Sequence, residues 1–143
     1  MRRIGILRST PLIAMLAACS GSNAAVHAPE IQPTERMLEH PLPMGIVETT
    51  LALGTSGEGG AASTSLLWLV ASDTREYVYA IATCHEAHQL EGDGDNLAVA
   101  ECDGQRYFVR RYDDRLQLRR DGDMRASFTI PAGWRVRARS ASP

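Results

Sequence analysis

The sequence predicts an all-β fold, a small antiparallel barrel or sandwich of about seven to eight short strands that follows a leader and a linker. From Gly45 onward, short runs rich in β-branched and aromatic residues alternate with turn clusters of Asp and Gly. The last run alternates Trp134, Val136 and Ala138 with three arginines. That period of two is typical of a strand with one buried face, and we find no long amphipathic helix.

The first segment, residues 1–18, predicts an export leader. Arg2, Arg3 and Arg8 make its start positive, and a short apolar run begins at Pro11. The positive end stays on the cytoplasmic side while the apolar run enters the membrane. The run is too short for a permanent span, which needs roughly 20 apolar residues.

The leader ends in Leu16-Ala17-Ala18-Cys19, which resembles the lipobox of bacterial lipoproteins. The resemblance implies cleavage before Cys19 and lipidation of its thiol. Two or three acyl chains anchor a protein stably, at ~0.8 kcal/mol per buried methylene. Ser20 follows the anchor, and by the sorting rule of these lipoproteins the absence of Asp there implies the outer membrane, on the periplasmic face. The other interpretation is an ordinary secretory leader.

Residues 19–44 predict the lipidated cysteine and a flexible linker, since they contain Pro29, Pro33, Pro41 and Pro43. A short helix from Thr34 to Glu39, capped by Thr34, is an alternative to a disordered tether.

Residues 45–143 predict the β domain. A long loop from Gly54 to Ser65 is expected because the segment is rich in Gly and Ser. Turns are expected at Asp73-Thr74, Gly92–Asp95, Asp113-Asp114 and Asp121–Asp123. The strands between them are 46–53, 65–71, 77–81, 87–90, 97–100, 107–112, 115–118, 124–130 and the final alternating run.

Cys84 and Cys102 predict a structural disulfide, because export places them in an oxidising compartment. If Gly92–Asp95 forms the loop, His85 faces Cys102 and Cys84 lies one step out of register, near enough for a bridge. The competing interpretation is a zinc site of both cysteines with His85 and His88. Strand alternation argues against it, because positions 85 and 88 point to opposite faces, and we expect no metal and no cofactor.

The hairpin around Asp113-Asp114 predicts two different faces. Its pairing places Phe108, Arg110, Tyr112, Arg115 and Arg119 on one side. Tyr107, Val109, Leu116 and Leu118 share the opposite, more apolar side and are the expected core. The first set is then an exposed arginine and aromatic surface, a composition enriched at binding interfaces. The alternative is an ordinary solvated face in a chain that uses Arg and no Lys.

The segment from Cys102 to Tyr112, followed by Leu116-Gln117-Leu118, resembles the membrane-bound inhibitors of c-type lysozyme. Those are small lipoproteins with an eight-stranded barrel, so the resemblance implies a barrel and an inhibitory role. It covers about a quarter of the chain. The Ser-Gly motif that enters the lysozyme cleft has no match between Asp121 and Pro143, and no inhibitory residue is carried over.

The sequence contains no convergent catalytic set, so we expect no enzyme but a non-catalytic periplasmic binding or inhibitor module. Its partners would be the membrane, through the lipid anchor, and an envelope protein or polymer. The net charge of -2 becomes more negative once the leader's arginines are removed, which disfavours a nucleic-acid partner. The alternatives are a structural component of an envelope or secretion assembly, and a small envelope hydrolase that would use His85 or His88.

Overall fold

A computed structural model describes residues 30–56 and 62–139 of the chain. All its regular elements are β-strands. Their bounds are β1 Thr34–Met37, β2 Ile46–Ser56, β3 Ser63–Ser72, β4 Arg75–Cys84, β5 Ala87–Leu90, β6 Asn96–Cys102, β7 Gln105–Tyr112, β8 Arg115–Arg120, β9 Asp123–Thr129 and β10 Arg135–Ala138.

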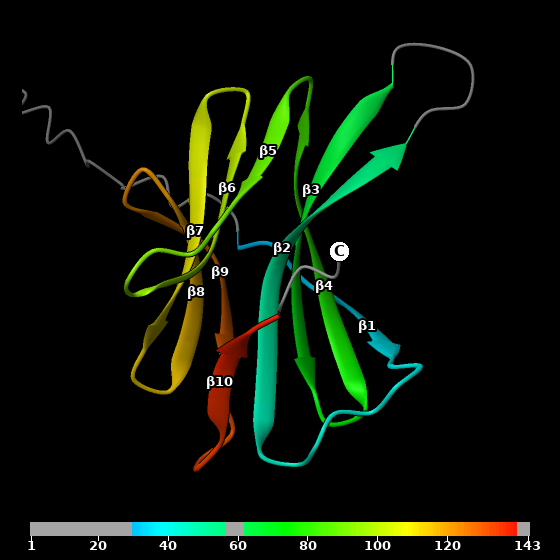
Figure 1. Cartoon of the computed structure of the whole chain (residues 1–143), viewed down its shortest axis with the longest axis vertical. Coiled ribbons are helices and arrows are strands. Elements are labelled where there is room, and N and C mark those ends of the chain that lie inside the picture. The colour runs from blue at the N-terminus through cyan, green and yellow to red at the C-terminus, as the bar shows by residue number, and fades with distance from the viewer. Residues whose placement is uncertain (1–29, 57–61, 140–143) are drawn as a thin grey trace, which may run out of the picture.

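The strands form two sheets that pack face to face as a small sandwich (Figure 1). Sheet A has the order β1-β4-β3-β2-β10, and sheet B has the order β5-β6-β7-β8-β9. This confirms the all-β prediction and selects the sandwich over the closed barrel. The described residues hold ten strands, more than the expected seven to eight, because each of the nine segments expected to be extended forms a strand and the unexpected β1 adds a tenth.

The alternative of a helix from Thr34 to Glu39 is wrong. Thr34–Met37 is strand β1, which pairs antiparallel with β4 from Thr34 opposite Val78 to Met37 opposite Arg75. A helix this short is marginal on its own, whereas the exposed edge of β4 offers hydrogen bonds to an extended segment. Cys19, the leader and the first part of the linker lie outside the described residues.

The predicted loop from Gly54 to Ser65 is also shorter than expected. Strand β2 continues to Ser56, and β3 already begins at Ser63. Gly54 pairs with Ser65 in a β2–β3 register that shows no shift along its whole length. Cross-strand pairing with a regular partner therefore overrides the weak strand propensity of these small residues; residues 57–61 lie outside the described part.

Strand β10 keeps the predicted alternation but not the predicted antiparallel neighbour. Trp134 and Val136 pack against the core, while Arg135 and Arg137 are exposed. The chain leaves β9 of sheet B and crosses to sheet A, where β10 pairs parallel with β2, Val136 opposite Val47. A parallel pair needs such a crossover connection, which alternation within one strand cannot reveal.

The core lies between the two sheets and centres on Trp68, which is fully buried. Its indole Nε1 donates a 2.8 Å hydrogen bond to Thr49 Oγ1, and its ring stacks on Tyr79 with centroids 4.5 Å apart. The Tyr79 hydroxyl reaches across to sheet B and donates to the carbonyl of Ser127 at 3.3 Å. Burial raises the pKa of Tyr79 to about 12, because the ionised phenolate would lose its hydration.

Tight turns at aspartates connect four pairs of consecutive strands. Asp73, Asp103, Asp113 and Asp121 all have positive φ angles, between 41° and 49°. Asp and Asn tolerate this left-handed conformation better than other non-glycine residues. The turn at Asp113 gives the predicted register, with Tyr112 opposite Arg115 and Phe108 opposite Arg119.

The β5–β6 register differs from the prediction. Ala87 lies opposite Cys102 and Leu90 opposite Val99. The pairing of His85 with Cys102 is therefore wrong by two residues, because β5 ends at Leu90 and the connection between the strands is longer than Gly92–Asp95. The predicted disulfide between Cys84 and Cys102 is nevertheless confirmed.

Candidate functional site

The disulfide lies at the corner of the sandwich where the chain passes from sheet A to sheet B. Cys84 is the last residue of β4 in sheet A, and Cys102 is the last residue of β6 in sheet B. Both cysteines are buried. The bridge therefore ties the sheets together where the chain passes from one to the other, and not the hairpin partners that the sequence suggested.

Asp103 organises the backbone beside this corner. Its Oδ1 accepts hydrogen bonds from the backbone N–H of Glu86 at 2.8 Å and of His85 at 2.9 Å. These two bonds favour the carboxylate and hold the pKa of Asp103 below its usual value. The histidines of the zinc interpretation are spread apart: the His85 side chain is fully exposed, and His88 contacts Glu86.

The cysteines of that zinc interpretation are bonded to each other and hold no thiolate for a metal. Within residues 30–56 and 62–139, no group of three or more His, Cys, Asp or Glu side chains has a geometry that could hold a metal ion.

The predicted arginine and aromatic surface lies on the outer face of sheet B, and we call it the sheet B face. It comprises the predicted residues Phe108, Arg110, Tyr112, Arg115 and Arg119, together with Arg106, which shares their side of β7. The opposite side chains Tyr107, Val109, Leu116 and Leu118 are buried in the core, as expected. Arg106 was not predicted as part of the surface, although its period-two spacing from Phe108 would have placed it there.

Aromatic rings and amide or hydroxyl groups hold the arginines of the sheet B face. The guanidinium of Arg110 lies 5.8 Å from the ring centre of Phe108, and that of Arg119 lies 5.8 Å from the ring centre of Tyr112. Arg110 also donates to Asn96 Oδ1 at 3.2 Å, Arg119 to Gln117 Oε1 at 2.8 Å, and Arg115 to Ser127 Oγ at 3.5 Å. Among the described residues, none of these arginines forms an ion pair with a carboxylate.

The outer face of sheet A carries a contrasting row of charges that the sequence did not predict. Arg36 of β1 lies opposite Glu76 of β4, Glu76 opposite Ala71 of β3, Ala71 opposite Glu48 of β2, and Glu48 opposite Arg137 of β10. One cross-strand row thus spans all the strands of the sheet. No sequence signal indicated it, because its members come from five separate strands.

Arg139, just after β10, forms ion pairs with both glutamates of this row. Its Nη1 lies 3.0 Å from Glu76 Oε1, and its Nε lies 3.6 Å from Glu48 Oε2. Ala71 separates the two glutamates across the sheet, and its small side chain leaves room for the guanidinium. Arg36 contacts Glu76 from the other side at 2.8 Å, so that the Glu76 side chain is only 6% exposed.

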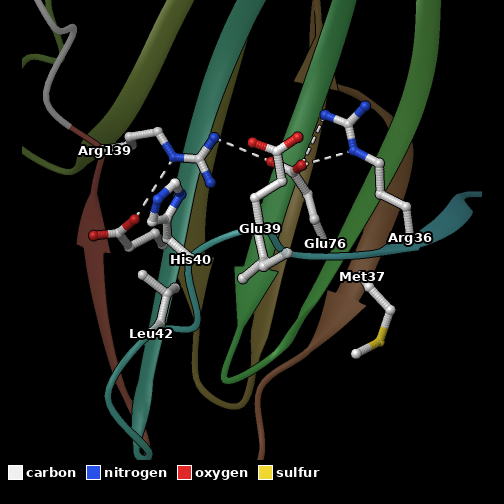
Figure 2. Close-up of a pocket in the computed structure, with 9 residues that line it drawn as sticks. Arg36, Met37, Glu39, His40, Leu42, Glu76 and Arg139 are labelled. Atoms are coloured by element: carbon white, nitrogen blue, oxygen red, sulfur yellow. Dashed lines mark hydrogen bonds and ion pairs between the residues drawn. The ribbon is translucent and has the colours of Figure 1, made fainter.

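A cavity of about 500 Å³ lies over this row (Figure 2). The segment between β1 and β2 covers it, with His40 and Leu42 on one side of Arg139 and Glu39 above Glu76. Glu76, which is buried, and Glu48, which is half-buried, lie at its floor and already form ion pairs with Arg139, which dashed lines mark in Figure 2. The charges of Glu48 and Glu76 already have cationic partners, so they are less available to a ligand than those of the sheet B face.

No helix in the described part of the chain is long and apolar enough to cross a membrane. Comparison of the chain with protein-family models, with curated proteins and with solved structures gives no match.

Proposed function

We propose that this chain is a non-catalytic binding module of the bacterial cell envelope. Lipid on Cys19 anchors it to the outer membrane, and the domain faces the periplasm. It recognises an acidic surface of a partner protein through the sheet B face. The support for the address is the leader and the lipobox-like segment ending at Cys19.

The observation that carries the binding role is the difference between the two outer faces. On sheet A, Arg36, Arg137 and Arg139 are all paired with glutamates. On the sheet B face, the arginines contact rings, amides and hydroxyls but no carboxylate of the described residues. Apart from Arg106, whose cross-strand neighbour is Glu101, these arginines have no carboxylate partner among the described residues, so their positive charge is available to an anionic partner.

The aromatic neighbours support recognition of a protein in particular. A guanidinium held over Phe108 or Tyr112 has lost part of its conformational freedom before binding, so less entropy is lost on association. Arginine and aromatic side chains are also the types that contribute most at protein interfaces. Carboxylates on the partner would accept paired hydrogen bonds from these guanidinium groups.

The test is affinity purification of the tagged full-length lipoprotein from its own envelope, followed by mass spectrometry. We expect one main acidic partner that is lost from the double variant R110Q/R119Q, with binding of the purified partner at least ~10-fold weaker. R75Q is the matched control, because Arg75 is exposed on sheet A and pairs with Glu35.

Three outcomes would contradict the proposal. Equal recovery of the partner by R110Q/R119Q and wild type would exclude the sheet B face. Recovery of several subunits of one assembly would favour a structural role. Turnover of an envelope substrate that depends on His85 or His88 would make the chain a hydrolase.

A further inference from the structure

Strand β2 extends well beyond its edge neighbour β10. The two strands pair only from Ile46 to Thr49, whereas β2 runs on to Ser56. On its other side, β2 pairs with β3 along this whole extension without a shift in register. Among the residues that the structure describes, no strand pairs with the outer edge of β2 after Thr49.

The hydrogen bonds to β10 show which backbone groups point to this edge. Arg135 N–H donates to the carbonyl of Gly45, and Arg139 N–H donates to the carbonyl of Thr49, both at 2.9 Å. In a strand, alternate residues direct their N–H and C=O groups to the same side. Because no bulge interrupts β2, this alternation means that the backbone N–H and C=O groups of Leu51, Leu53 and Thr55 point to the open edge.

A cleft of about 410 Å³ adjoins the edge. It lies between sheet A, at the middle of β2 and the end of β10, and sheet B, at the end of β5 and the start of β6. Its apolar lining includes Leu51, Leu90, Leu97, Val99 and Ala138. Leu90 is 38% exposed, and Leu53, the next inward-facing residue along β2, is 37% exposed.

We infer that the open edge of β2 and this cleft form a binding site for an extended segment of another polypeptide. The segment would add to sheet A as a strand along Leu51–Thr55 and place an apolar side chain in the cleft. The N–H and C=O groups along an open strand edge can form hydrogen bonds with the backbone of another strand. The adjoining apolar lining then selects among the alternate side chains that the added strand points inward.

A single extended segment matches this geometry better than a second copy of the domain. The cleft lies between the two sheets and meets β2 at Thr50 and Leu51, where the open edge begins, and β5 and β10 flank it. A second copy would bring a whole sheet and its packed partner layer to the same narrow opening. The site uses no residue of the sheet B face, so its failure and the failure of the proposed function can be distinguished.

The probe is a displayed library of random 12-residue peptides, selected on the purified full chain in detergent. We expect selected peptides to carry apolar residues at alternate positions and to slow hydrogen exchange of the Leu53 and Thr55 amides. Thr55→Pro removes an edge donor that bonds no other strand in the described structure, and its exposed side chain limits the loss of packing. T55P should bind the peptides at least tenfold more weakly, whereas the matched control T55V should bind as wild type does.

Leu90→Asp provides a second variant that changes the cleft and leaves β2 intact, and it should also weaken binding at least tenfold. The inference is overturned if no peptide is selected, or if T55P and L90D bind as tightly as wild type. It is also overturned if exchange protection maps to the sheet B face. Concentration-dependent dimerisation of the free chain that T55P abolishes would identify a second copy as the occupant instead.

Discussion

At the scale of single residues, small differences in surroundings decide whether an arginine of this domain has a carboxylate partner. Arg139 can lie between Glu48 and Glu76 because Ala71, the residue between them in the cross-strand row, has only a methyl group. A larger side chain there would occupy the space of the guanidinium. On the outer face of sheet A this arginine is paired with carboxylates. On the sheet B face, Arg110 and Arg119 have none among the described residues.

Glu76→Gln tests the buried row. The carboxylate of Glu76 is almost fully buried and contacts both Arg36 and Arg139. Replacing it with a neutral amide leaves two guanidinium groups without their charge partner, so we expect the free energy of unfolding to fall by about 1–2 kcal/mol. Urea denaturation followed by circular dichroism measures this.

The control is Glu35→Gln, which removes an exposed partner of Arg75 one strand away. Its unfolding midpoint should equal that of wild type, because exposed ion pairs contribute little. Equal midpoints for E76Q and wild type would show that the row does not stabilise the sheet.

At the scale of the elements, strands with a clear alternating pattern were easier to predict than those at the edges. The register of the β7–β8 hairpin was predicted to the residue, because the Asp113-Asp114 turn is short and one face is apolar throughout. Strand β1 has four exposed residues and no apolar face, so no pattern distinguished it from a linker. The β5–β6 register was wrong because β5 is similarly exposed and its connection contains several residues able to turn.

The disulfide between β4 and β6 is a covalent cross-link between the two sheets. Its removal tests how much the stability of the sandwich depends on this cross-link. The cysteines are separated by 18 positions in the sequence. Closing a loop of this size stabilises by roughly 3 kcal/mol in the chain-entropy model. C84A/C102A should therefore lose about that much unfolding free energy and keep a strand-rich far-UV spectrum.

Reduction provides the control for this prediction. Dithiothreitol should lower the urea midpoint of wild type towards that of C84A/C102A, and it should leave the double variant unchanged. An oxidised wild type that unfolds at the same urea concentration as the reduced protein would contradict the stabilising role. Free thiols at Cys84 and Cys102 in protein isolated from the envelope would contradict the bridge itself.

At the scale of the whole molecule, the outer faces of the two sheets differ in how their arginines are partnered. On sheet A the arginines of the charged row pair with glutamates, on the sheet B face the arginines contact rings, amides and hydroxyls, and the cleft lies between the two sheets beside β2 and β5. If the chain is tethered through its N-terminus, β1 is the first strand after the tether and lies at an edge of sheet A. The outer face of sheet B is then turned away from the sheet that holds this first strand.

Cys19→Ala tests the proposed anchor. Without the thiol, neither diacylglycerol transfer nor the cleavage that follows it can occur at this position. The variant should incorporate no radiolabelled palmitate and should appear as an unprocessed precursor, or without lipid in the soluble envelope fraction. Equal palmitate labelling of C19A and wild type would refute lipidation at Cys19.

Patterns in the amino-acid sequence predicted the all-β class, most of the turns, the faces of the β7–β8 hairpin and the partners of the disulfide. These features depend on contacts between near neighbours in the chain and, for the disulfide, on the presence of only two cysteines in the segment expected to fold as the β domain, and local patterns report both. The choice of sandwich over barrel, the parallel pairing of β10 with β2, and the row of Arg36, Glu76, Ala71, Glu48 and Arg137 across the five strands of sheet A emerged only from the fold. Those features depend on which distant segments pack side by side, and period-two alternation in one strand carries no information about its neighbour across the sheet.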